Sequence, residues 1–205
     1  MLEWKYSMNV FLQKKYFLLG IIGLFLVLFV WSLVLGGKDS SSSLPNTQTI
    51  VKEYDPERSG TMQHLDELVM KGISSIEEMK PFITDKDPKH RWVAVYVIGR
   101  VSDVSRVQIL LPLLQDEDES VRISAAGTLA NKGYKEALPV LISGLDSTYS
   151  ITYLHPEREM ADFSLEVLTF YTGLSFSSSS EWQKWWDETQ EKLVWDETAK
   201  KYTGK

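Results

Sequence analysis

Two stretches of this chain repeat each other at an interval of 31 residues. Residues 85–100 read DKDPKHRWVAVYVIGR, and residues 116–131 read DEDESVRISAAGTLAN. Both stretches begin with acidic residues, have an arginine at the seventh position and continue with apolar and small residues at helical spacing. A unit of this length has an apolar face that it cannot bury by itself, so neighbouring units must cover each other. The repeat therefore predicts that the units stack in a row.

Each unit is predicted to be a pair of helices. An apolar segment precedes each stretch, at residues 76–83 and 107–114, and a third apolar segment lies at residues 137–146. The acidic residues that open both stretches suit a helix N-terminus, where free N–H groups and the helix dipole favour carboxylates. We therefore predict an all-α fold, a short α-solenoid of about three to four helix pairs over residues 61–175.

One stretch, residues 113–146, reads LLQDEDESVRISAAGTLANKGYKEALPVLISGLD. Its Leu-Leu, Asp, Val-Arg, Ala-Ala and Ala-x-Pro-x-Leu elements resemble the HEAT-repeat family, in particular its short bacterial variety, also called phycobilisome-lyase HEAT-like repeats. The resemblance extends over about residues 62–175. It implies a right-handed stack of antiparallel helix pairs that contacts other proteins, and it implies no activity, because most members are scaffolds.

The arginines at the seventh position, Arg91 and Arg122, allow two interpretations. They form either a basic strip on the concave face or a ladder of pairs with aspartates of neighbouring units. The ladder is favoured, because the planar guanidinium group suits bidentate pairing with a carboxylate.

Residues 16–35, YFLLGIIGLFLVLFVWSLVL, form an uncharged apolar run of about 20 residues, which is long enough to cross a bilayer. A cleavable signal peptide would have a shorter apolar region followed by small residues, whereas bulky residues stand at 33–35. A buried core helix is rarely apolar on all sides. We therefore expect a single transmembrane helix, which anchors the chain in the cell (inner) membrane.

The segments on either side of this run predict its orientation. Lys14 and Lys15 end a basic N-terminal segment, residues 1–15, which the positive-inside rule places in the cytoplasm. The C-terminal domain is then extracytoplasmic. Residues 36–60 are rich in Ser, Gly, Pro and charged residues, so we predict a flexible linker there.

Composition excludes several classes of function. The chain has no cysteine, which excludes disulfides, thiolate metal sites and cysteine nucleophiles. Its net charge is −6, so nucleic acid is not an expected partner. Its three histidines, at positions 64, 90 and 155, lack the spacing of metal ligands, and no catalytic motif is present. We expect no enzyme activity, metal or cofactor; the alternative is a ligand sensor or an enzyme of the lyase-like HEAT type with an unrecognised site.

Two segments stand out as candidate contact surfaces. The connection at residues 147–157 is long for such a repeat, and long loops in compact repeats are often functional. Residues 176–205 predict a Trp-rich capping helix followed by a frayed charged tail. One face of that helix either covers the last helix pair or offers aromatic anchors to a partner. The candidate partner-binding residues are Tyr149, Tyr153 and His155 in the connection and Trp182, Trp185 and Trp186 in the helix.

Together these features predict a membrane-anchored HEAT-repeat module for protein–protein interaction, an adaptor or accessory subunit of a membrane protein complex. Its partners are then the membrane, through residues 16–35, and another protein. A second version of this hypothesis makes the transmembrane helix the main contact, with the solenoid covering a larger assembly.

Overall fold

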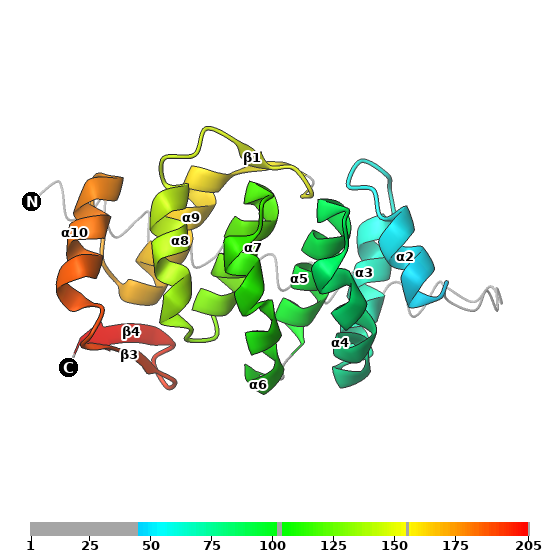
Figure 1. The fold of residues 1–205 in the computed structure, drawn as a ribbon, viewed down its shortest axis with the longest axis horizontal. Coiled ribbons are helices and arrows are strands. Elements are labelled where there is room, and N and C mark those ends of the chain that lie inside the picture. Colours follow the sequence, from blue (N-terminus) through cyan, green and yellow to red (C-terminus); the bar gives the residue numbers. More distant parts are fainter. Residues whose placement is uncertain (1–44, 102–103, 155, 205) are drawn as a thin grey trace, which may run out of the picture. The chain divides into compact units, whose positions relative to one another are not determined.

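A computed structural model of the chain describes residues 45–101, 104–154 and 156–204 (Figure 1). The predicted basic segment 1–15, the predicted transmembrane helix 16–35 and the first part of the predicted linker lie outside the described residues. Among the helices that the structure describes, none has the length and apolar character needed to cross a membrane.

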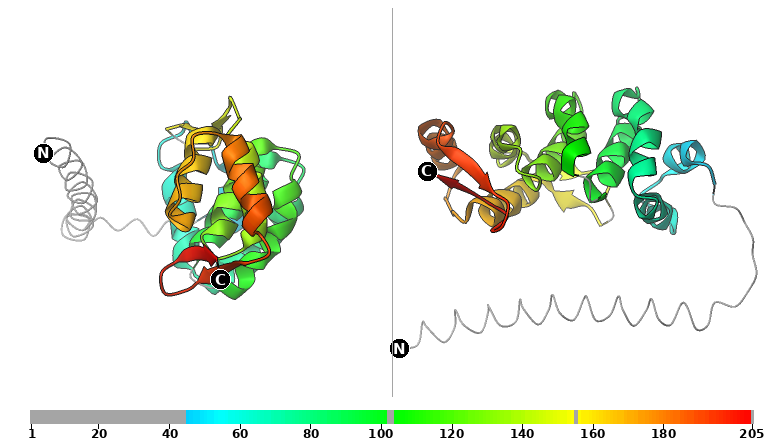
Figure 2. Two further views of the ribbon diagram at one scale, coloured as in Figure 1. Left: turned by 90° about the vertical axis from the view of Figure 1, so that its left-hand side faces the viewer. Right: turned by 90° about the horizontal axis from the view of Figure 1, so that it is seen from below.

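Helices in two layers make up most of residues 45–204 (Figures 1 and 2). Each inner helix packs against the next one along the chain, and outer segments pack against them. The inner helices are α3 (Thr61–Met70), α5 (Pro88–Arg100), α7 (Glu119–Ala130) and α9 (Met160–Thr172). The outer segments are α4 (Ile73–Met79) with η1 (Lys80–Thr84), α6 (Val104–Val107) with η2 (Gln108–Gln115), and η3 (Lys135–Ala137) with α8 (Leu138–Gly144). This arrangement confirms the predicted helical solenoid.

Proline explains why the outer segments are partly 3₁₀-helical. Pro81 lies in the first turn of η1, and Pro112 lies inside η2. Proline has no N–H group to donate to the preceding turn, so regular α-helix cannot run through these positions. The inner helices α5 and α7, by contrast, begin with aspartate caps: Asp87 accepts a hydrogen bond from the Lys89 N–H group at 2.9 Å, and Asp118 accepts one from the Val121 N–H group at 3.0 Å.

Glycines let successive inner helices approach each other closely. A Cβ atom on Gly99 of α5 would lie 2.6 Å from Thr128 Cγ2 of α7. A Cβ atom on Gly127 of α7 would lie 2.4 Å from Phe163 Cζ of α9. Because both positions lack a side chain, the residue on the next helix fills the space.

A buried ion pair joins the first two repeat units. Arg91 donates from Nε to Asp116 Oδ2 at 2.7 Å and from Nη2 to Asp116 Oδ1 at 2.6 Å. The ladder interpretation is therefore confirmed for Arg91. Arg122 donates to the backbone carbonyl of Asp116, in its own unit, at 2.5 Å. The ladder ends there, because the residue 31 positions after Asp116 is Ser147, which has no carboxylate.

The structure corrects the C-terminal boundary of the predicted linker. Helix α2 (Thr47–Glu53) lies within it and packs against α3, with Ile50, Val51 and Tyr54 buried in the core. Thr47, the other buried residue of this helix, completes an i, i+3, i+4, i+7 pattern that predicts an amphipathic helix. The polar composition of the whole segment concealed that short pattern.

Two small antiparallel sheets modify the all-α prediction. Strand β1 (Ser150–Ile151) pairs with β2 (Arg158–Glu159), within and just after the long connection. Strand β3 (Leu193–Asp196) pairs with β4 (Lys201–Gly204), where a frayed tail was predicted. That hairpin is fixed to the solenoid, because Tyr202 is buried and its hydroxyl group donates to the Ala130 carbonyl at 3.1 Å.

Candidate functional site

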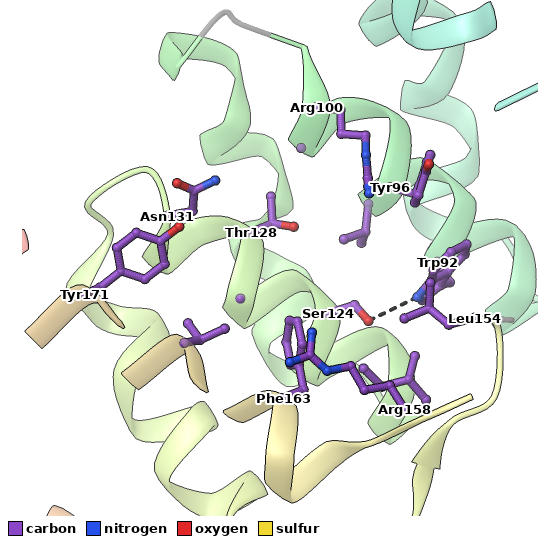
Figure 3. A pocket seen from close by; sticks show the side chains of 15 residues that line it. Trp92, Tyr96, Arg100, Ser124, Thr128, Asn131, Leu154, Arg158, Phe163 and Tyr171 are labelled. Atoms are coloured by element: carbon purple, nitrogen blue, oxygen red, sulfur yellow. Dashed lines mark hydrogen bonds between the residues drawn. The ribbon is translucent and has the colours of Figure 1, made fainter. Parts of the chain in front are cut away.

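A groove with a volume of about 480 Å³ lies on the inner helices α5, α7 and α9, and the β1–β2 connection forms one side of it (Figure 3). We call it the inner groove. Its volume is in the range typical of binding pockets in proteins. Each helix contributes one stripe of residues at i, i+4 and neighbouring helical spacings. The stripes are Trp92, Val95, Tyr96, Gly99 and Arg100 on α5; Ser124, Gly127, Thr128 and Asn131 on and just after α7; and Phe163, Val167 and Tyr171 on α9.

The middle stripe is polar. Ser124 accepts a hydrogen bond from Trp92 Nε1 at 3.0 Å, which leaves its own hydroxyl hydrogen available (Figure 3). Within the described part of the chain, the side chains of Thr128 and Asn131 have no hydrogen-bond partner. A hydroxyl group and an amide can both donate and accept, so this stripe offers both kinds of group to a ligand.

Aromatic rings and two arginines stand on either side of that stripe. The guanidinium carbon of Arg100 lies 3.7 Å from the centre of the Tyr96 ring, and that of Arg158 lies 5.0 Å from the centre of the Phe163 ring. Both distances allow a cation–π interaction. Arg158 also pairs with Glu166, whose side chain is largely exposed. The groove therefore carries positive charge on stacked, partly oriented side chains.

Tyr96 remains a neutral hydrogen-bond donor at ordinary pH. Burial raises the pKa of its phenol to about 12, and the hydrogen bond that its hydroxyl donates to Asp66 Oδ1, at 2.8 Å, acts in the same direction. Tyr96 is thus a rigid platform beneath Arg100 and carries no charge of its own.

The connection at residues 147–157 partly lines the groove, through Ile151 and Leu154. Of its candidate residues, Tyr153 holds the connection in place: its hydroxyl donates to Asp118 Oδ2 at 3.0 Å, and its carbonyl accepts from the Tyr54 hydroxyl at 2.7 Å. Tyr149 is 68% exposed and is not part of the groove lining. His155 lies outside the described residues.

The Trp-rich helix α10 (Ser179–Thr189) packs against α8 at the end of the row. Trp182 is fully buried, Trp186 is 9% exposed, and Trp185 is half-buried in edge contact with Trp182 at 5.7 Å. This placement is the one expected of a cover on the last helix pair. In this position, Trp182 and Trp186 offer no exposed face to a partner.

The groove residues Arg100, Thr128, Asn131 and Arg158 were not among the sequence candidates. One signal could have found two of them, because Arg100 and Asn131 occupy equivalent positions in the 31-residue repeat. Equivalent positions on stacked helices face the same side, so comparing the two stretches by face would have brought these residues together. Arg158 had no such signal, because it reaches the groove from strand β2.

Comparison with known families agrees with this architecture. Residues 76–152 match the family model for HEAT repeats, a segment that includes both copies of the 31-residue repeat. No curated protein matches the sequence. The match supports a HEAT-repeat α-solenoid, and HEAT repeats generally mediate protein–protein interaction.

Proposed function

We propose that this chain is a membrane-anchored HEAT-repeat module that binds another protein through its inner groove. It would act as an adaptor or accessory subunit of a membrane protein complex. The observation that carries the proposal is the groove itself: three successive repeat units each present a stripe of residues to one shared surface. A surface that several units build together suits an elongated partner better than a small substrate.

The membrane part of the proposal rests on residues 16–35, whose length and lack of charge suit a bilayer-spanning helix. We place the N-terminus in the cytoplasm and the solenoid outside it, because Lys14 and Lys15 directly precede the apolar run. Protease added to the outside of spheroplasts should then remove the solenoid. Protection of the solenoid would reverse the orientation.

We also propose that the repeats are of the short bacterial variety, the phycobilisome-lyase HEAT-like repeats. The proposed function includes no catalytic activity. The alternative, a ligand sensor or an enzyme of the lyase-like HEAT type, would also use the inner groove, whose volume would accommodate a small molecule. An adaptor would bind a protein in the groove, whereas a sensor or enzyme would bind a small molecule there.

Site-specific photo-crosslinking tests this difference. A photoreactive amino acid at Asn131, which is exposed in the groove, should crosslink to a protein of defined mass in living cells. The same amino acid at Gln108, exposed on the outer segment η2, is the matched control and should give a much weaker product. Native mass spectrometry of the full-length protein in mild detergent should then show a heteromeric complex.

Crosslinking from Gln108 and not from Asn131 would place the contact on the outer layer and refute the role of the groove. A monomer or homodimer in the native spectrum, with no product from either position, would refute the adaptor role and favour the small-molecule alternative.

A further inference from the structure

The charge of the inner groove is opposite to that of the chain as a whole. The chain has a net charge of −6, with 28 acidic and 22 basic residues. Among the described residues that line the groove are Arg100 and Arg158 and no aspartate, glutamate or lysine. A cationic groove in an acidic protein attracts a negatively charged ligand.

The two arginines line the groove, and the guanidinium group of each lies over an aromatic ring. A guanidinium group stacked on an aromatic ring uses its flat face and keeps the N–H groups of its edge free for a carboxylate. Arg100 is stacked on Tyr96 in this way and, within the described part of the chain, has no acidic partner. Arg158 is stacked on Phe163, and its one acidic partner among the described residues is the exposed Glu166. An exposed pair of this kind is weak and can be exchanged for a ligand carboxylate.

The polar stripe on α7 favours an extended polypeptide as the ligand. Figure 3 shows Ser124 and Thr128 between Arg100 on one side and Arg158 on the other. The free hydroxyl and amide groups of Thr128 and Asn131 match the unpaired N–H and C=O groups of an extended backbone. A helical ligand has already paired its backbone groups internally and would leave this stripe unused.

A second cavity continues the groove beyond α7. It has a volume of about 360 Å³ and shares Asn131 and Tyr171 with the inner groove. Its charged lining residues are Lys132, Lys200 and Glu197, and Lys200 pairs with Glu197. The path is therefore longer than one side chain, and toward the C-terminal hairpin Lys132 leaves it one positive charge in excess.

From this arrangement we infer that the inner groove binds an extended acidic segment of a protein partner, with its carboxylates on Arg100 and Arg158 and its backbone on Thr128 and Asn131. The inference rests on the proposed function and specifies the chemistry of the partner. Because stacking already orients both guanidinium groups, little side-chain entropy is lost when they bind a carboxylate.

The test uses the full-length protein in mild detergent and two pools of fluorescein-labelled octapeptides. In one pool, alternate positions are fixed as Asp or Glu; in the other, the same positions are Asn or Gln. We expect the acidic pool to bind about tenfold more tightly in fluorescence anisotropy, and its affinity to fall as salt is raised. Arg100→Gln and Arg158→Gln should each weaken binding of the acidic pool about tenfold. Arg100→Lys should weaken it less, because the charge remains and the bidentate edge is lost.

Arg106→Gln is the matched control, because Arg106 lies on the outer helix α6 and pairs with Glu77 at 2.7 Å. It should leave the binding of both pools unchanged. Equal binding of the two pools, or unchanged binding of the acidic pool in both groove variants, would overturn the inference. If Asn131 still crosslinks to a cellular protein when both arginines are replaced, the proposed function stands and the acidic ligand is refuted.

Discussion

Replacing one member of the Arg91–Asp116 pair should destabilise the protein strongly, because the other member stays buried without its partner. The two side chains share two hydrogen bonds, of 2.7 Å and 2.6 Å, and join neighbouring repeat units. Arg91 is 6% exposed and Asp116 is 9% exposed, so water cannot take the place of a missing partner. The carboxylate of Glu117, 3.6 Å from Arg91, is largely exposed and compensates little.

The expected loss of unfolding free energy follows from the charge that stays buried without its partner. Arg91→Met leaves the carboxylate of Asp116 buried without its cation, and Asp116→Asn leaves the guanidinium without its anion. Each should cost about 3–5 kcal/mol of unfolding free energy. The double variant Arg91→Met/Asp116→Asn removes both charges and keeps an oxygen that can accept from the Asp118 N–H group, as Asp116 does at 2.9 Å. It should cost about 2–3 kcal/mol, well below the sum of the two single variants, because a buried pair replaced as a whole is often close to neutral. The cost that remains comes from the two hydrogen bonds that Arg91 Nη1 donates to the Asp85 and Lys86 carbonyls, at 2.9 Å and 3.2 Å, which the methionine cannot make.

Arg122→Met is the matched control, because Arg122 holds the same position in the next unit and, among the described residues, its side chain donates only to a backbone carbonyl of its own unit. It should cost about 1.5 kcal/mol. Urea unfolding of the full-length chain, followed by circular dichroism at 222 nm, gives the four free energies by linear extrapolation. If the Arg91 and Asp116 variants cost no more than Arg122→Met and their effects add in the double variant, the pair does not hold the two units together.

Three further predictions concern packing, pH and the hairpin. Gly127→Ala should lower the free energy of unfolding by about 1–2 kcal/mol, because the new Cβ would lie 2.4 Å from Phe163 Cζ and the cost of this overpacking exceeds the gain in helix propensity. Thermal unfolding measures the loss. Phe163→Leu added to the same variant should restore part of it. Tyr96 and Tyr153 have pKa values raised to about 12, chiefly by burial, so the folded state holds their protons more tightly than the unfolded state, where the pKa is about 10. Their stabilisation should therefore be complete below pH 10 and be lost between pH 10 and pH 12, which urea unfolding at pH 9 and pH 11 can test. Tyr202→Phe removes a buried hydrogen bond of 3.1 Å to the last carbonyl of α7 and should cost about 1 kcal/mol in urea unfolding.

A specific result would contradict each of these three predictions. An unchanged or higher melting temperature for Gly127→Ala would mean that the ring of Phe163 turns aside at little cost. Equal pH dependence in wild type and in the Tyr96→Phe/Tyr153→Phe variant would show that other groups cause the alkaline loss. A stable Tyr202→Phe variant would show that the hairpin is held by its apolar contacts alone.

The repeated part of the fold could be predicted because its determinants are local. The aspartate caps, the small residues and the prolines recur in sequence near the turns and contacts that they determine. A pair between Arg91 and an aspartate of the next unit followed from the same repeat, because stacking brings the arginine of one unit close to the acidic start of the next. Helix α2 and the C-terminal hairpin are each single elements with polar surroundings, and their burial depends on surfaces far away in sequence, such as the contact between Tyr202 and Ala130.

The groove could be predicted only in part. Trp92 and Tyr96 are both largely buried, and they also line the groove. Which stripe of each inner helix faces the groove depends on the angle between successive units, and no single unit encodes that angle. The contribution of Arg158 depends on the path of the β1–β2 connection, which the repeat pattern does not contain.

The contact between Tyr54 and Tyr153 has a consequence for how the protein moves. These residues are 99 positions apart, and their hydrogen bond of 2.7 Å connects the N-terminal end of the row to its third unit. A solenoid held only by nearest-neighbour interfaces can unzip from either end, one unit at a time. Here the connection closes a loop around the middle unit, so the end units cannot open without breaking it. We therefore expect amide hydrogen exchange to report one cooperative opening of the first three units, and the spacing between Arg100 and Arg158 to be set before any partner arrives.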